Sequence, residues 1–269
     1  MKRILLTVLA LCMCFGTVAA LTACKHDHVS TTAWTGDDTD HWHKCDECEE
    51  QLDKAAHTWG DAVKVSHGTY KYTCTTCQRE KTENSETTVT ADQFTAAFSL
   101  GTNYTVVVDA THPTQGSYHS VDMRDGNKYS SAETMTAPNG EKNESRDFSA
   151  IEGEDCYYYN VSYDDNGNLT SCTRSKSDQT VDEFVSSKES YFLPSFLRDF
   201  TKFTYDAESK LYVAATISER ITEAKLGFED GKIVSFSYVN TMNDGSEVPY
   251  SFTFTYGTAA VTLPELTAQ

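Results

Sequence analysis

Residues 250–256 read Tyr-Ser-Phe-Thr-Phe-Thr-Tyr, and this alternation of aromatic and small polar side chains decides the fold of most of the chain. Successive side chains of a β-strand point to opposite faces, so the four aromatic rings are expected to share one face of a sheet. The same period of two recurs within residues 104–108 and 234–238. The region after residue 90 is therefore predicted to be mainly β.

Turn signals separate these apolar runs. Asp-Gly or Asn-Gly pairs stand at residues 125–126, 166–167, 230–231 and 244–245. Such pairs favour the tight turns that join neighbouring antiparallel strands. About ten strands in one long meander are expected.

Two helices are expected to interrupt the strands. Thr90 and Gln93 match a capping box, and Thr180 and Glu183 match a second one. The second helix leads into an apolar cluster within residues 196–200 that is too apolar to lie open to water. We expect this cluster to cover one face of the sheet.

Composition excludes one class of partner. The 269-residue chain has 22 basic and 40 acidic side chains, a formal net charge of -18. A surface this acidic repels nucleic acid and offers no basic stripe. Its 15 Tyr and 13 Phe, against 14 Gly and 5 Pro, favour packed β-structure over disorder.

Residues 26–77 form a distinct module. They hold six of the eight histidines, all three tryptophans and four of the nine cysteines. Its metal-binding residue types recur at an offset of 29, which indicates an internal duplication. The repeated residues are His28, Cys45 and Cys48, then His57, Cys74 and Cys77.

A Cys-x-x-Cys turn brings two thiolates to one ion, and tetrahedral zinc needs two more sulfur or nitrogen ligands from another segment. Two ligand assignments are open. In the first, Cys45, Cys48, Cys74 and Cys77 hold one zinc ion, as in a zinc ribbon. In the second, each repeat builds its own site, and His57 completes the first of them with His28, Cys45 and Cys48.

The second assignment resembles the His/Cys repeats of many surface proteins of Gram-positive bacteria. There, a segment like residues 41–48, His-Trp-His-Lys-Cys-Asp-Glu-Cys, is followed by a histidine and an aromatic residue, here His57 and Trp59. The chain departs from that pattern after Cys77, so a second site would need His67 or a water molecule, or would not exist. We expect one well-formed structural zinc site at the first Cys-x-x-Cys, with its other ligands open.

Other chemistry for these cysteines is less well supported. Disulfides are reasonable outside the cytoplasm, yet they give no reason for histidines to recur at a fixed offset. Redox chemistry needs a lowered thiol pKa, which Asp46, Glu47, Glu49 and Glu50 would oppose. A catalytic zinc would need an open ligand position and a cleft, for which the module is too small.

The N-terminus resembles a bacterial lipoprotein signal. Lys2 and Arg3 precede an uncharged stretch from residue 4 to residue 23, typical of a secretory signal peptide. The stretch ends Leu21-Thr22-Ala23-Cys24, which resembles a lipobox. The resemblance implies cleavage before Cys24, a diacylglycerol on its thiol, and a membrane anchor that two acyl chains make stable. An uncleaved membrane span is the alternative.

The region after residue 90 resembles in layout the lipoprotein-carrier (LolA-like) fold, a curved antiparallel sheet with helices on its concave side. That resemblance implies an apolar ligand between sheet and helices, in a cavity lined by Phe184, Phe192, Phe196 and Phe236, although ordinary core is the simpler role for each. Separately, Cys156 and Cys172 flank the turn at 166–167. A tight turn there pairs Cys172 with Val161, so a disulfide would need a bulge or a longer loop.

These observations predict an α+β, mainly β protein. We expect a signal peptide (1–23), a small zinc-ribbon-like metal module (24–80), a linker (81–90) and a curved antiparallel β-sheet domain with covering helices (91–269). No catalytic motif is present. The expected function is a non-enzymatic lipoprotein on the extracellular face of the bacterial membrane, with a ligand- or partner-binding β-domain. Zinc capture or transfer and carriage of a lipid or other apolar ligand are the alternatives.

Overall fold

The computed structural model describes residues 26–164 and 166–267. The predicted signal peptide (1–23) and lipidation site, Cys24, lie outside the described residues. The chain forms two compact units. One contains the described residues up to Val63 together with Lys71–Glu83, and the other contains Lys64–Tyr70 and the described residues from Asn84 onward. In the described part of the chain, no helix has both the length and the apolar character needed to cross a membrane.

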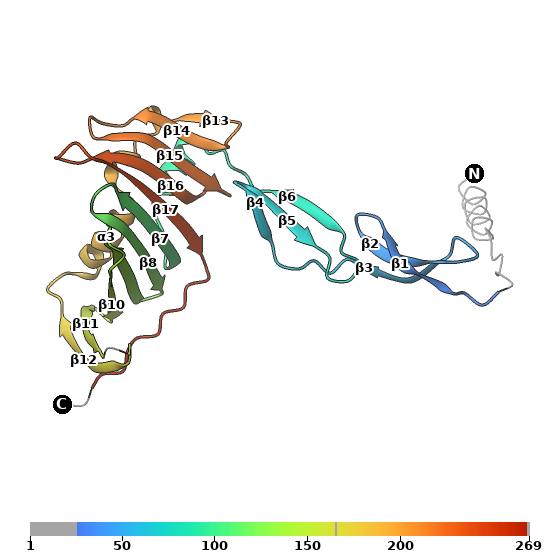
Figure 1. Ribbon diagram of the computed structural model, residues 1–269, viewed down its shortest axis with the longest axis horizontal. Coiled ribbons are helices and arrows are strands. Elements are labelled where there is room, and N and C mark those ends of the chain that lie inside the picture. Colours follow the sequence, from blue (N-terminus) through green and yellow to red (C-terminus); the bar gives the residue numbers. More distant parts are fainter. Residues whose placement is uncertain (1–25, 165, 268–269) are drawn as a thin grey trace, which may run out of the picture. The chain divides into compact units, whose positions relative to one another are not determined.

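The duplicated segment folds into two three-stranded antiparallel sheets, coloured blue and cyan in Figure 1. Every strand of the second sheet lies close to 29 residues after its counterpart in the first, so the sequence repeat is also a structural repeat. The first sheet contains β1 (Ser30–Gly36), β2 (Asp40–Cys45) and β3 (Gln51–Ala56), and the second contains β4 (Val63–Ser66), β5 (Thr69–Thr73) and β6 (Glu80–Asn84). The predicted linker, 81–90, thus begins inside a strand.

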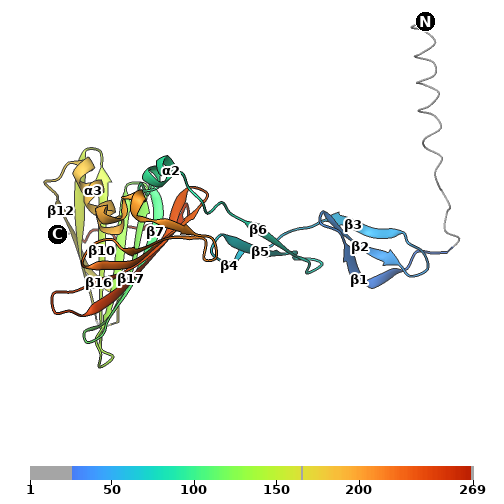
Figure 2. The ribbon, with the colours of Figure 1, turned by 90° about the horizontal axis from the view of Figure 1, so that it is seen from above.

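The larger unit is built on one antiparallel sheet of eleven strands, as its alternating sequence predicts (Figures 1 and 2). The chain is therefore mainly β. The strands are β7 (Asn103–His112), β8 (Gly116–Asp125), β9 (Lys128–Thr136), β10 (Lys142–Glu152), β11 (Asp155–Tyr163), β12 (Leu169–Lys176), β13 (Thr204–Asp206), β14 (Leu211–Thr216), β15 (Ile221–Glu229), β16 (Lys232–Thr241) and β17 (Glu247–Tyr256).

The strand order corrects the expectation of one long meander. The order is β12-β11-β10-β9-β8-β7-β17-β16-β15-β14-β13, which is two meanders joined by the pairing of β7 with β17. The chain moves outward from the centre to β12, crosses to the opposite edge at β13, and returns. The helical segment after β12 makes that crossing, since hairpin turns can only join neighbouring strands.

Both predicted capping boxes are formed. Thr90 accepts a hydrogen bond from the backbone N–H of Gln93 at the start of α2 (Ala91–Ala96), and Thr180 does the same with Glu183 at the start of α3 (Val181–Phe192). Two 3-10 turns follow, η1 (Ser195–Leu197) and η2 (Phe200–Lys202). In Figure 2, α2 and α3 lie over one face of the large sheet.

The core lies between this face and the helices. Leu197, which is fully buried, packs with Phe94 of α2 and with the inward residues of β7, β15, β16 and β17. Phe236 and Phe252 stack across two strands with ring centroids 4.0 Å apart. A separate, smaller cluster around Phe184 sits under the start of α3 against β9, β10 and β11.

Residues 64–70, around the turn between β4 and β5, belong to this second unit and contact Glu229. Glu229, at the end of β15, is only 7% exposed. Its carboxylate accepts hydrogen bonds from Lys64 Nζ at 2.7 Å, from the backbone N–H of Gly68 at 2.9 Å and from the hydroxyl of Tyr70. His67 Nδ1 lies 3.4 Å from the same carboxylate.

Candidate metal centres

The backbone around the Cys-x-x-Cys makes matching hydrogen bonds in the two repeats. Cys45 N–H donates to the carbonyl of Glu50, and 29 residues later Cys74 N–H donates to the carbonyl of Arg79. The residue after each of these cysteines, Asp46 or Thr75, donates its N–H to the residue just after the repeated histidine. These bonds hold the start of each repeat beside its cysteine turn, which explains why a histidine 17 residues earlier in the sequence reaches the thiols.

The first candidate centre contains His26, His28, Cys45 and Cys48. Their ligand atoms all lie within 4.8 Å of one another. His26 Nε2 is 3.2 Å from Cys45 Sγ, and His28 Nδ1 is 3.7 Å from Cys48 Sγ. Both histidines precede β1, while Cys45 is the last residue of β2 and Cys48 follows it.

The second candidate centre contains His41, His57, Cys74 and Cys77, again with all ligand atoms within 4.8 Å. His57 Nδ1 is 3.3 Å from Cys77 Sγ, and His41 Nδ1 is 4.0 Å from Cys74 Sγ. His41 lies on β2 in the first sheet and is 3% exposed. The second centre therefore takes one residue from the first repeat.

These separations suit a tetrahedral metal ion. With zinc–sulfur and zinc–nitrogen bonds of about 2.3 and 2.0 Å, two ligand atoms at a tetrahedral angle lie about 3.5 Å apart. The four sulfur–nitrogen distances run from 3.2 to 4.0 Å and bracket that value. Two imidazoles and two thiols are also the ligand types that zinc prefers.

One thiol of each group, Cys45 or Cys74, has a lowered pKa, which favours the thiolate. Burial acts to raise the pKa of Cys45, but the backbone N–H of Glu47 and the His26 imidazole outweigh it and lower the pKa to about 6. Burial likewise opposes ionisation of Cys74, and the backbone N–H of Cys77 with the His57 imidazole brings its pKa to about 6. A thiolate is the form that binds a metal ion.

The outer ring nitrogens are held in the orientation that metal binding requires. His57 Nε2 lies 2.9 Å from the carbonyl oxygen of Asp37, which can only accept, so Nε2 carries the proton and Nδ1 presents its lone pair to the centre. His28 Nε2 lies 3.0 Å from Glu50 Oε2. Such outer partners fix the tautomer of histidine ligands in metalloproteins.

The structure distributes the predicted ligands differently from either assignment. The four cysteines do not gather around one point, and His57 lies with Cys74 and Cys77 instead of completing the first group. His67, considered for a second site, lies in the second unit, where its Nδ1 is 3.4 Å from the Glu229 carboxylate. Sequence reasoning assigned neither His26 nor His41 to a metal site, because neither has a histidine at the repeat offset.

None of the six described cysteines forms a disulfide. The candidate bridge between Cys156 and Cys172 does not form. Cys172 pairs with Val161, as the turn predicted, so it lies five residues along the strand from Cys156 and on the opposite face of the sheet. Cys156 packs with Phe184, while Cys172 packs with Ala150 and Tyr159.

Comparison with known proteins adds no relative. No protein-family model matches the chain, and no curated protein matches it.

Proposed function

We propose that the protein is a lipid-anchored lipoprotein on the extracellular face of a bacterial membrane. In this proposal the duplicated module is held together by two structural zinc ions, and the β-rich domain binds a ligand or partner without catalysing a reaction. The observation that carries the zinc assignment is the pair of four-residue groups, each with two histidines and two cysteines.

The module's burial pattern supports a structural role for the metal. In the described part of the first unit, only His41, Trp42, Cys45 and Cys74 are buried, and three of these four belong to the candidate centres. An apolar core this small cannot stabilise two sheets by itself. Metal binding supplies folding free energy in such modules.

The closed ligand sets favour a structural ion over a catalytic or transferred one. Each group already offers four protein ligands, which fills a tetrahedral zinc shell and leaves no position for water or substrate. A capture or transfer protein needs an exchangeable ion, and buried ligands such as Cys74 and His41 disfavour exchange. Zinc capture remains the second candidate function, and it predicts weak metal binding and an intact fold without metal.

The anchor is proposed from the sequence. The basic start at Lys2 and Arg3, the uncharged stretch and the lipobox-like ending at Cys24 together support cleavage and diacylglycerol attachment. Cells expressing the chain should incorporate labelled palmitate into it, and the Cys24→Ser variant should not. Equal labelling of both forms would refute the anchor.

The zinc proposal is tested on the full chain purified in detergent. Elemental analysis should give about two zinc ions per chain, with the module's thiols reactive only after a strong chelator is added. Cys74→Ser should leave about one zinc ion, because the first centre keeps all four of its ligands. Cys172→Ser, which removes a buried thiol outside both centres, is the matched control and should leave two. If the protein contains no metal and the module's thiols do not react, these cysteines form disulfides and the zinc proposal is refuted.

A further inference from the structure

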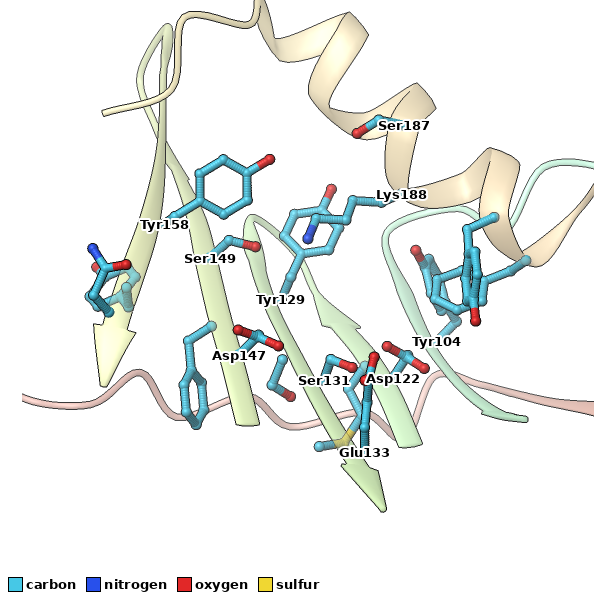
Figure 3. Close-up of a pocket in the computed structure, with 17 residues that line it drawn as sticks. Tyr104, Asp122, Tyr129, Ser131, Glu133, Asp147, Ser149, Tyr158, Ser187 and Lys188 are labelled. Carbon is cyan, nitrogen blue, oxygen red and sulfur yellow. The ribbon is translucent and has the colours of Figure 1, made fainter. Parts of the chain in front are cut away.

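A polar strip crosses the helix-facing side of the large sheet. Asp122 on β8 pairs with Ser131 on β9, and Ser131 pairs with Asp147 on β10. Paired residues of antiparallel strands share a face, so two carboxylates flank one hydroxyl on the same side. Figure 3 shows these three residues below α3, which carries Lys188 above them. Apolar side chains would be expected at a helix–sheet interface, and this strip replaces them.

The strip borders a cavity of about 480 Å³ between α3 and strands β8–β11. Tyr104 and Tyr129 line it and are 1% and 5% exposed. Among the described residues, neither tyrosine hydroxyl has a hydrogen-bond partner. The hydroxyl of Ser130, which also lines the cavity, has none either. Buried hydroxyl groups without partners are costly, so a bound molecule with polar groups of its own is expected there.

The charges in the cavity select against anions. Asp122, Glu133 and Asp147 line it together with a single ammonium group, that of Lys188. Among the described residues no carboxylate lies within 4.0 Å of Lys188 Nζ, which instead lies over the Tyr158 ring, 5.4 Å from its centroid. Asp122 accepts one hydrogen bond, from Ser120, and Asp147 is exposed. An acyl chain would offer no hydrogen bond to either of them or to Glu133. A neutral molecule rich in hydroxyl groups would satisfy both the acids and the tyrosine hydroxyls.

Aromatic rings extend the cavity outward. Tyr191 borders this cavity and also a second one of about 760 Å³ that is lined by Tyr118 and Tyr250. Tyr191 is 56% exposed, so its ring stands open between the two cavities. The carbon–hydrogen faces of a pyranose ring stack on such aromatic surfaces, while its hydroxyl groups reach carboxylates and serines at the edge.

We infer that the cavity under α3 is a binding site for a neutral saccharide, with one sugar unit held over the Asp122–Ser131–Asp147 strip and the chain continuing past Tyr191. This deepens the proposed function, because it rests on the ligand-binding role given there to the β-rich domain. It also replaces the apolar ligand implied by the carrier-like layout. Of the four phenylalanines considered for that ligand, only Phe192 lines this cavity.

The test uses the full chain in detergent and isothermal titration calorimetry. The probes are glucose, N-acetylglucosamine and their β-1,4-linked disaccharides, with glucuronate as the anionic probe and dodecanoate as the apolar one. Saturable binding of at least one neutral sugar is expected, with glucuronate at least tenfold weaker than glucose. Asp147→Asn and Tyr129→Phe should each weaken sugar binding at least fivefold. Asp109→Asn, an exposed carboxylate on the opposite face of β7, is the matched control and should bind as the wild type does.

Failure of this inference is distinguishable from failure of the wider proposal. If no neutral sugar binds, or if Asp147→Asn binds as tightly as the control, the saccharide site is refuted. Dodecanoate binding that survives Asp147→Asn would refute it too and would support an apolar-ligand carrier. Zinc content measured on the same samples reports on the metal module independently, so a loss there would not affect the sugar result.

Discussion

Glu229 gives the sharpest test of how the second unit is held together. Its carboxylate accepts hydrogen bonds from three donors. Two of them are the Gly68 N–H, in the turn between β4 and β5, and the Tyr70 hydroxyl, on β5. Glu229→Gln keeps the side chain's shape but removes the charge and turns an N–H₂ group toward these donors. Lys64 is 46% exposed, so its share is screened by water and counts for little.

The size of the effect follows from the two remaining donors. Hydrogen bonds to a charged acceptor contribute about 1.5–3 kcal/mol each, and the amide keeps at most one of them in weaker form. The free energy of unfolding of the second unit should therefore fall by about 2–3 kcal/mol. With a urea m-value of about 2 kcal/mol/M, the midpoint should drop by about 1–1.5 M.

The assay separates the two units. All three tryptophans lie in the first unit, so tryptophan fluorescence follows the module, while tyrosine fluorescence and far-ultraviolet circular dichroism follow the β-domain. Glu223→Gln, an exposed carboxylate on the same strand, is the control and should shift the midpoint by less than about 0.3 M. A Glu229→Gln midpoint within that range would refute the reasoning.

The effect should depend on pH. Burial opposes ionisation of Glu229, but hydrogen bonds from Lys64, Tyr70 and Gly68 together lower its pKa. A carboxyl group with a lower pKa in the folded than in the unfolded protein stabilises the fold above its unfolded pKa, about 4.3, and loses that contribution as pH falls through the folded value. The difference in free energy of unfolding between wild type and Glu229→Gln should have its full value at pH 7 and should decrease below pH about 4.

Three further outcomes can be measured by the same unfolding assay and by thiol titration. Gly116→Ala should lower the free energy of unfolding by at least about 3 kcal/mol, because a Cβ there would lie 1.9 Å from a backbone oxygen of β9 at a φ of +101°. The control, Gly140→Ala, has nothing within 4 Å of its added Cβ and should cost about 1 kcal/mol. Equal losses for the two variants would contradict this geometry. Thr180→Ala should cost about 1 kcal/mol through the lost cap of α3, and a change below about 0.3 kcal/mol would argue against that cap. Cys156 and Cys172, both 0% exposed, should react with a thiol reagent only after urea unfolding, and rapid reaction of the native protein would show that one of them is open to solvent.

Local patterns predicted the elements of the large sheet well. The alternating runs became strands, and the two capping boxes start helices where expected, because these signals depend only on residues within a few positions of one another. The strand order could not be read in the same way. It depends on pairs such as Val107 with Thr253, which lie far apart in the sequence and carry no complementary motif.

The candidate metal centres show the same contrast between local sequence signals and contacts between distant residues. The two Cys-x-x-Cys turns were predicted because a short local motif encodes them. His28 lies with Cys45 and Cys48 as predicted, but His57 lies in the other group. His26 and His41 were not assigned, since periodicity favours histidines that recur, and only His28 and His57 do so. The signal that would have placed His57 correctly was its spacing: it precedes Cys74 by the same interval that separates His28 from Cys45.

Two of the candidate ligands, His26 and His41, do not recur at the repeat offset. His41 belongs to the first sheet but lies in the second centre, so removing the first repeat would leave the second centre with three ligands. The residue 29 positions after His41 is Tyr70, which cannot supply a nitrogen ligand and whose hydroxyl instead donates to Glu229. At the other end, His26 fills in the first centre the place that His41 fills in the second. Each candidate centre therefore takes one histidine from the segment before its own repeat. A third repeat placed after the second would need a histidine at position 70 to complete a third centre.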